Sequence, residues 1–178
     1  MASTKEAHRR KAANGRQDPC AWPLLTRENF ERLCFERSNL RCVLCGGQAV
    51  DAHHIFERKL FPDGGYRLNN AAALCSPCHW RAEIGLDTPC AILAACGLDD
   101  PLPPPHAAAA GLSPSAILSH MDKWGNLTRS DGSIAPGPLF QDDGCRKALA
   151  AGGRLGLCYE AGDFQCSQID VPAATRKK

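Results

Sequence analysis

The chain has 178 residues, a formal net charge of +2 and an aromatic content of only 6%. This length suits one ordinary domain, or a small domain with attached segments, and the scarcity of aromatic side chains argues against a single large core. A nearly neutral net charge does not by itself indicate any class of binding partner. Because the sequence shows no apolar stretch typical of a secretory signal or a membrane span, we expect a cytoplasmic protein in a reducing compartment, with no membrane partner.

The first part of the chain predicts a basic arm followed by a helix. Residues 1–25 are expected to form a flexible arm, in which KEAHRRKAANGR carries five Lys or Arg residues and one Glu. Such a segment, like the terminal RKK, suits phosphate contacts or a solvated tail equally well. Thr26 stands at an N-cap position, with Phe30, Leu33 and Cys34 at helical spacing, which predicts an amphipathic helix over about residues 27–38.

The following segment predicts a ββα unit. CVLCGG is typical of a metal knuckle, since glycine lets the backbone turn around ligand sulfurs. QAVDAHHIF alternates as a strand does, and FPDGGYRL supplies a turn at residues 63–65 and then a return strand. SPCHWRAEIG begins with Ser76 and Pro77, an N-cap and N1 pair, and stops at Gly85, which predicts a helix.

The remainder of the chain contains turn and helix-start signals but no chemical motif. TPCAILAAC, from Thr88 to Cys96, begins with a Thr-Pro pair that resembles an N-cap and N1 pair, and it predicts another helix that completes a domain over residues 26–98. Residues 99–112 are rich in Pro and Ala, which predicts a linker. In the C-terminal segment, residues 113–178, SPSAILSHMDKWG and DDGCRKALAAGG predict short helices and RLGLCYE predicts a strand. Its role stays unassigned, with target recognition and dimerisation as candidates.

The cysteines give the strongest signal. There are 11 of them, and where disulfides are not expected to persist, clustered cysteines indicate metal ligands. Two C-x-x-C pairs bring four thiolates within reach of one tetrahedral Zn²⁺: Cys42, Cys45, Cys75 and Cys78. Four protein ligands leave no open coordination position, so this zinc is expected to be structural. A second site among Cys145, Cys158 and Cys166 is not favoured, because no C-x-x-C spacing supports it.

The histidines suggest a second centre. Three of the chain's six histidines fall between His53 and His79, beside a zinc site that needs none of them. Consecutive strand residues point to opposite faces, so His53 and His54 are expected to have different roles. One of them, with His79, could hold a divalent ion, and the other could be a general base, since a histidine pKa of about 6.5 suits proton abstraction near neutral pH. Asn70 could fix the hairpin loop by side-chain hydrogen bonds to backbone.

The pattern C-V-L-C, D-A-H-H-I and N-A-A-A-L-C-S-P-C-H resembles the HNH endonuclease family, the ββα-metal or His-Me finger nucleases, in its four-cysteine zinc variant. The likeness covers residues 30–85. It implies an α+β fold: a small zinc-stapled, treble-clef-like ββα-metal core with flanking helices and an unassigned mixed C-terminal segment. By resemblance, His54 is the general base and Asn70 is the family's middle asparagine. His53 and His79 are then the ligands of the catalytic metal. Many members have Asp in place of His53, and Asp51, on the same strand face, is a further candidate ligand.

The resemblance also implies a reaction. It is hydrolysis of a DNA phosphodiester by water that His54 activates, with Mg²⁺ or Mn²⁺ stabilising charge on the phosphate. Double-stranded DNA is the expected partner; a monomer would nick it, and a homodimer could cut both strands. Four cations around the expected site are candidates for binding flanking phosphates: Arg58, Lys59, Arg67 and Arg81.

Two other functions stay open. A non-catalytic zinc module that binds nucleic acid or protein would need the cysteines but not His54, Asn70 and His79, and the presence of all three favours an enzyme. The same nuclease chemistry on RNA is not distinguished by these residues, because DNA is preferred from the family and not from the motif.

Overall fold

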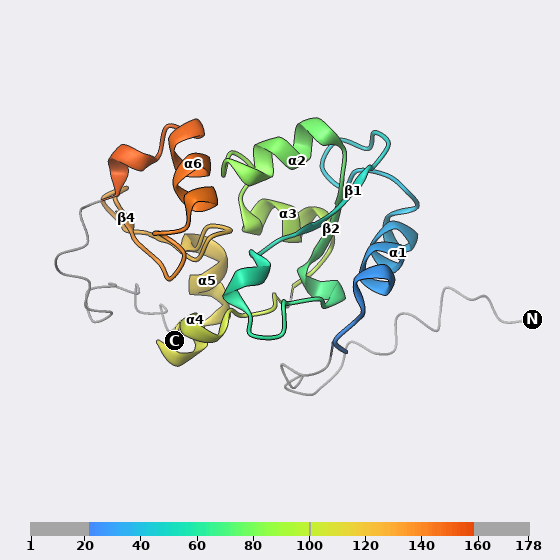
Figure 1. Ribbon diagram of the computed structural model, residues 1–178, viewed down its shortest axis with the longest axis horizontal. Coiled ribbons are helices and arrows are strands. Elements are labelled where there is room, and N and C mark those ends of the chain that lie inside the picture. The colour runs from blue at the N-terminus through green and yellow to red at the C-terminus, as the bar shows by residue number, and fades with distance from the viewer. Residues whose placement is uncertain (1–21, 100, 159–178) are drawn as a thin grey trace, which may run out of the picture.

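A two-stranded antiparallel hairpin lies between helices in the N-terminal half of the protein (Figure 1). The structure, a computed structural model, describes residues 22–99 and 101–158. Strand β1 (Asp51–His54) pairs with β2 (Ala71–Leu74), so that His53 stands opposite Ala72 and His54 opposite Ala71. All four residues of β2 are buried. The hairpin is therefore covered on both faces, which the small alanine side chains permit.

Helix α1 (Arg27–Ser38) covers one face of the hairpin, with the bounds that the sequence predicts. Thr26 caps it by accepting a hydrogen bond from the Asn29 amide at 3.2 Å. The helix ends at Ser38, and its C-cap residue Asn39 adopts a left-handed conformation with φ of 52°. Its buried residues, Phe30 and Cys34, pack on the alanines of β2 that point to this side, Ala71 and Ala73.

Helix α2 (Ser76–Glu83) belongs to the opposite face, where Cys78 and Ala82 share a core with Ala72 and Leu74. Its N-cap is Cys75 and not Ser76, so the predicted cap is wrong by one residue. The reason is that Cys75 has extended dihedral angles while its carbonyl already accepts the first helical bond, from the His79 amide at 2.8 Å. Helix α3 (Pro89–Ala95) follows, capped by Thr88 as predicted.

The return strand starts later than the sequence predicts. FPDGGYRL forms turns instead of a strand, and two short 3-10 helices, η1 (Arg58–Leu60) and η2 (Leu68–Asn70), precede β2. The physical reason lies partly at Gly65, which has φ of 62° and where an added Cβ would lie 2.5 Å from the Phe61 ring. The chain therefore makes a wide, folded loop between the two strands.

The C-terminal half is helical with one small hairpin. Its elements are α4 (Pro105–Ala109), α5 (Pro114–His120), β3 (Leu127–Thr128), β4 (Ile134–Ala135), α6 (Asp143–Ala151) and η3 (Leu155–Leu157). The two expected helices are present as α5 and α6. The strand expected over RLGLCYE is wrong in the described residues, because this segment forms η3 and only a single bridge, between Cys158 and Ile134.

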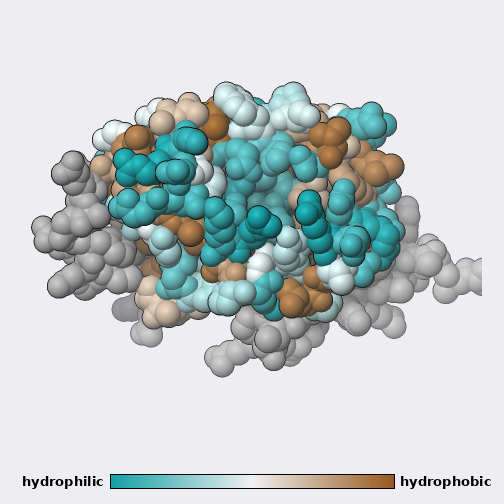
Figure 2. Space-filling view, viewed as in Figure 1, coloured by the Kyte–Doolittle hydropathy of each residue, from teal (hydrophilic) through white to brown (hydrophobic). Residues whose placement is uncertain are grey.

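The expected linker carries structure of its own. It contains α4, and Leu102, Pro104 and Ala107 within it are buried. One core cluster runs from the hairpin through this segment to Ile117 and Met121, so the two halves share a core. Polar residues cover the middle of the face seen in Figure 1, and apolar residues lie in smaller patches (Figure 2). In the described part of the chain, no helix has the length and apolar character needed to cross a bilayer.

Candidate functional site

The four predicted zinc ligands come together. Cys42 and Cys45 lie on the knuckle and Cys75 and Cys78 at the start of α2, and one ligand atom from each lies within 4.8 Å of the others. The sulfurs of Cys45 and Cys75 are 3.5 Å apart. The knuckle is closed by backbone bonds from the Cys42 amide to Gly47 at 2.7 Å and from the Gly46 amide to Cys42 at 2.8 Å. This arrangement is compatible with a structural metal such as zinc.

The surroundings of Cys42 favour the thiolate form that a metal requires. Burial of its sulfur would raise the pKa, but backbone N–H groups of Cys75, Cys45 and Leu44 donate to it and together lower the pKa to about 7. Among the described residues, Cys145 and Cys158 join no comparable group of three ligands, and Cys166 lies outside those residues.

A second ligand group forms between β1 and α2. It consists of His53, His79 and Glu83, with ligand atoms within 4.8 Å of one another. Glu83 Oε1 lies 3.4 Å from His53 Nδ1 and 3.2 Å from His79 Nε2. The sequence predicted the two histidines as ligands of one metal, but it did not predict Glu83. The signal that could have found it is the i,i+4 spacing from His79, which places both side chains on one helical face.

The protonation states of these three residues decide how readily the group can bind a metal. His53 is 3% exposed, and burial lowers its pKa to about 4, so its ring is neutral. Burial would raise the pKa of Glu83, but hydrogen bonds from His53, His79 and Lys123 hold it far below its usual range. The hydrogen bond to Glu83 raises the pKa of His79. Neutral imidazole and ionised carboxylate are the forms that bind metals, so His53 and Glu83 already fit a divalent ion, whereas His79 would have to lose the proton that its raised pKa favours.

His54 lies on the other face of the hairpin, against α1. Its ring stacks on Phe30 at 4.5 Å and meets the edge of Tyr66 at 4.9 Å. Burial lowers its pKa to about 4, with repulsion from His53, Lys123 and Arg58 adding to the effect. Its Nε2 atom is buried and has no hydrogen-bond partner among the described residues.

A polar hollow of about 350 Å³ opens beside His54. Its charged lining residues are Arg27, Glu31, Asp51 and Arg58. Asp51 also reaches His79, with 3.0 Å between its Oδ2 and the ring Nδ1. This carboxylate therefore connects the hollow of His54 with the ligand group on the opposite face of the strand.

Asn70 closes the long loop between the strands. It is fully buried, and its side chain accepts a hydrogen bond from the Phe56 amide at 2.8 Å. It donates to the carbonyls of Phe56 at 3.1 Å and Gly65 at 3.2 Å. These are the side-chain bonds to backbone that the sequence predicts, and they fix the segment that follows His54.

The predicted phosphate-binding cations are not equivalent. Arg58 lines the hollow beside His54. The other three form ion pairs: Lys59 with Asp142 at 2.6 Å, Arg67 with Asp63 at 2.6 Å, and Arg81 with Asp87 at 2.9 Å. Contact of these three with a substrate stays a prediction. Arg27 was missed by sequence reasoning; it lies on the first turn of α1, and no signal in the sequence placed that helix beside the hairpin.

The chain matches no protein-family model, no curated protein and no solved structure. The family resemblance therefore rests on the sequence motif alone.

Proposed function

We propose that the protein is a metal-dependent nuclease that hydrolyses DNA phosphodiester bonds. In this proposal His54 is the general base, and His53, His79 and Glu83 hold the divalent metal. The observation that carries the proposal is the contrast between two neighbouring residues. His53 faces Glu83 with its Nδ1 atom inside a three-ligand group, whereas His54 belongs to no such group in the part of the chain that the structure describes and lines a polar hollow. The Nε2 atoms of both rings are buried and have no hydrogen-bond partner among the described residues.

The environment of His54 supports a role as base. A general base must be unprotonated before reaction and must reach the water whose proton it takes. With a pKa of about 4 the ring is neutral near pH 7, and no described residue forms a hydrogen bond with its Nε2 atom. This atom is buried, so the hollow would have to open further for a water to reach it. Phe30 and Tyr66 hold the plane of the ring. The ring is therefore unprotonated before substrate arrives, and its low pKa makes it a weaker proton acceptor than an ordinary histidine.

The charges of the hollow support binding of a phosphate at the edge of β1. Arg27 and Arg58 can both present guanidinium groups there, which are suited to phosphate oxygens. Glu31 and Asp51 also line the hollow, so its charge is mixed. A phosphate there would lie next to His54. Asp51, which also lines the hollow, pairs with His79 of the ligand group. The two arginines would supply positive charge in the hollow, and a bound metal would supply it at the ligand group on the other face of the hairpin.

The ligand atoms of the group indicate which divalent metal it would prefer. Bound there, a divalent ion would supply positive charge to a phosphate oxygen and to the leaving oxygen. Two imidazole nitrogens and one carboxylate oxygen suit Mn²⁺ better than Mg²⁺, which prefers oxygen ligands and retains several waters. DNA is preferred over RNA from the motif's family resemblance alone, so both polymers belong in the test.

A second candidate is a zinc-stabilised binding module without catalysis. One observation favours it: Glu83 is already paired with the Lys123 ammonium, and three of the predicted substrate cations are paired with carboxylates. The second ligand group can therefore be neutralised without a metal.

Cleavage of supercoiled plasmid in Mn²⁺ or Mg²⁺ separates the two candidates. The nuclease proposal expects open-circular or linear DNA from wild type, and loss of that product in His54→Ala with zinc content unchanged. A labelled RNA duplex in parallel tests the polymer. Equal behaviour of wild type and His54→Ala would leave the binding module as the better account.

A further inference from the structure

A lysine from the C-terminal half reaches into the ligand group. Lys123 lies just after α5, and its side chain is only 7% exposed. Its ammonium hydrogen-bonds Glu83 Oε1, the same oxygen that faces His53 and His79. A second carboxylate is close, since Nζ lies 3.6 Å from Glu57 Oε2. The ammonium therefore stands between two carboxylates, at the oxygen that a metal would need.

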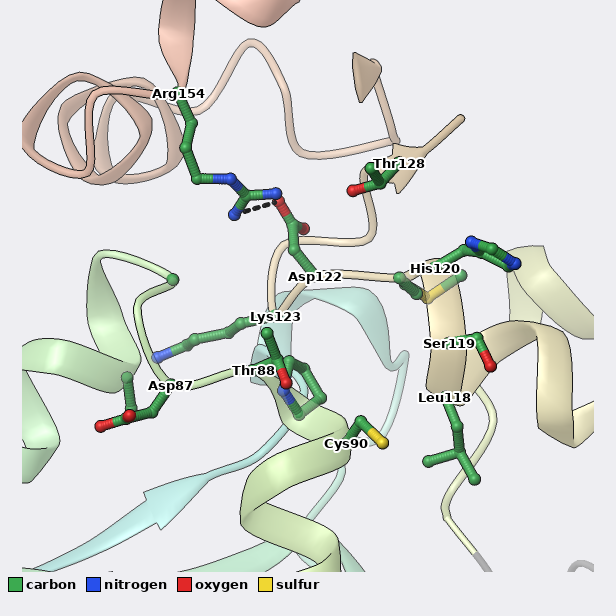
Figure 3. Close-up of a pocket in the computed structure, with 14 residues that line it drawn as sticks. Asp87, Thr88, Cys90, Leu118, Ser119, His120, Asp122, Lys123, Thr128 and Arg154 are labelled. Carbon is green, nitrogen blue, oxygen red and sulfur yellow. Dashed lines mark ion pairs between the residues drawn. The ribbon is translucent and has the colours of Figure 1, made fainter. Parts of the chain in front are cut away.

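The position of Lys123 is built by several backbone and side-chain contacts. Its carbonyl accepts a hydrogen bond from the Glu57 amide at 2.9 Å. The indole of Trp124 donates to the Glu83 carbonyl at 3.4 Å. Asp122 holds the turn by accepting from the Trp124 amide at 2.9 Å. In Figure 3, Asp122 reaches toward Arg154 while Lys123 extends the other way. This loop is anchored on both sides of the lysine, so the ammonium is aimed at Glu83.

Electrostatics make the ammonium and a metal exclusive at this oxygen. A buried ammonium costs free energy unless carboxylates pair with it, and Glu83 and Glu57 provide that pairing. A divalent ion bound by Glu83 would lie within a few ångströms of the ammonium, where repulsion between the two cations is strong. The ammonium could instead pair with Glu57, whose Oε2 lies 3.6 Å from Nζ, so only a small movement of the lysine side chain would be needed.

We propose that Lys123 is the resident counter-ion of the metal-free ligand group, and that a divalent metal binds by displacing its ammonium from Glu83 to Glu57. The inference rests on the ligand set of the proposed function, but not on cleavage. It gives the C-terminal half a role, since Lys123 from this half would set the affinity of the group for a divalent ion.

The test is Mn²⁺ binding to the zinc-loaded full chain, measured by titration calorimetry. Lys123→Met removes the competing cation and should bind Mn²⁺ about tenfold tighter or more, because a charge-assisted hydrogen bond no longer has to be broken. Glu57→Gln removes the second partner of the ammonium and should weaken binding severalfold. In the double variant the effect of Glu57→Gln should vanish, because no ammonium remains to be relocated.

Two controls separate displacement from general charge effects and from misfolding. Lys147→Met removes an exposed lysine of α6 and should leave Mn²⁺ affinity unchanged. Lys123→Arg keeps a cation and should bind no tighter than wild type. The inference is overturned if Lys123→Met binds Mn²⁺ no tighter than wild type, or if the effects of the two substitutions simply add. A tighter Lys123→Met that cuts no DNA would leave the inference standing and would remove the nuclease proposal.

Discussion

His53 and His54 are consecutive residues of β1, yet their rings belong to opposite faces of the hairpin. The ring of His53 lies 5.0 Å from that of His79, on the side of α2. The ring of His54 is stacked on Phe30, on the side of α1. A single peptide unit thus separates a ligand group from a candidate base. The two histidines share one property, since burial lowers the pKa of each to about 4.

These two rings should make the protein less stable in acid. Between pH 6.5 and pH 4 the unfolded chain binds protons at these positions that the folded chain does not. The free energy of unfolding should therefore fall as pH decreases through this window, by about 1 kcal/mol for each ring between about pH 7 and about pH 5.5. Denaturant unfolding at the two pH values measures it. His54→Phe keeps an aromatic ring against Phe30 but cannot bind a proton. Its free energy of unfolding should therefore fall less between the two pH values than that of wild type, and an equal fall would contradict the lowered pKa of His54.

Zinc removal should unfold the N-terminal half. The cysteine cluster joins the knuckle to α2, and structural zinc sites contribute on the order of 10 kcal/mol to folding. Metal analysis should find zinc bound at this cluster, and Cys75→Ser should lose it together with the cooperative thermal transition. Cys90→Ser, at an exposed cysteine outside the cluster, is the matched control and should retain both. Full stability of Cys75→Ser without zinc would refute the structural role.

Loss of the Asn70 side chain should destabilise the loop that follows His54. Asn70→Ala leaves the Phe56 amide and the carbonyls of Phe56 and Gly65 buried without their partner, which should cost roughly 3 kcal/mol. Asn29→Ala, at an exposed residue of α1, should change stability by less than about 0.5 kcal/mol. Chemical denaturation of both variants checks the difference, and comparable small effects would show that the buried amide is not what closes the loop.

Truncation after residue 112 should not yield a folded N-terminal domain. Ile117, Met121 and Leu127 belong to the same buried cluster as the hairpin and α2, so their removal exposes apolar surface. We expect an aggregating fragment, seen by size-exclusion chromatography and by lost amide dispersion in NMR spectra. A monomeric, zinc-bound fragment with a cooperative transition would instead restore the predicted boundary at residues 99–112.

Local signals were predictable from the sequence. The predicted caps Thr26 and Thr88 each accept from the amide three residues on, and Ser113, in the predicted Ser-Pro helix start, does the same. Such caps depend only on neighbouring residues. The four-cysteine cluster was predictable for a related reason, because each C-x-x-C pair is local and only the meeting of the two pairs depends on the fold.

Contacts between distant segments were not predictable in the same way. Lys123 is 40 residues from Glu83 in sequence, and its contact depends on how the two halves pack. No periodicity or spacing encodes that contact. The long loop before β2 was missed because its turns depend on tertiary bonds to Asn70, which compete with strand propensity.

The most direct test of the account is the Mn²⁺ dependence of single-turnover DNA cleavage by wild type, His54→Ala and Glu83→Gln. If the ligand group and the base are separate, Glu83→Gln should require far more Mn²⁺ yet recover rate at saturation. His54→Ala should bind Mn²⁺ normally and remain slower by about 10²–10⁴-fold at every concentration. A His54→Ala rate equal to wild type, or Mn²⁺ binding unaffected by Glu83→Gln, would contradict the central claim.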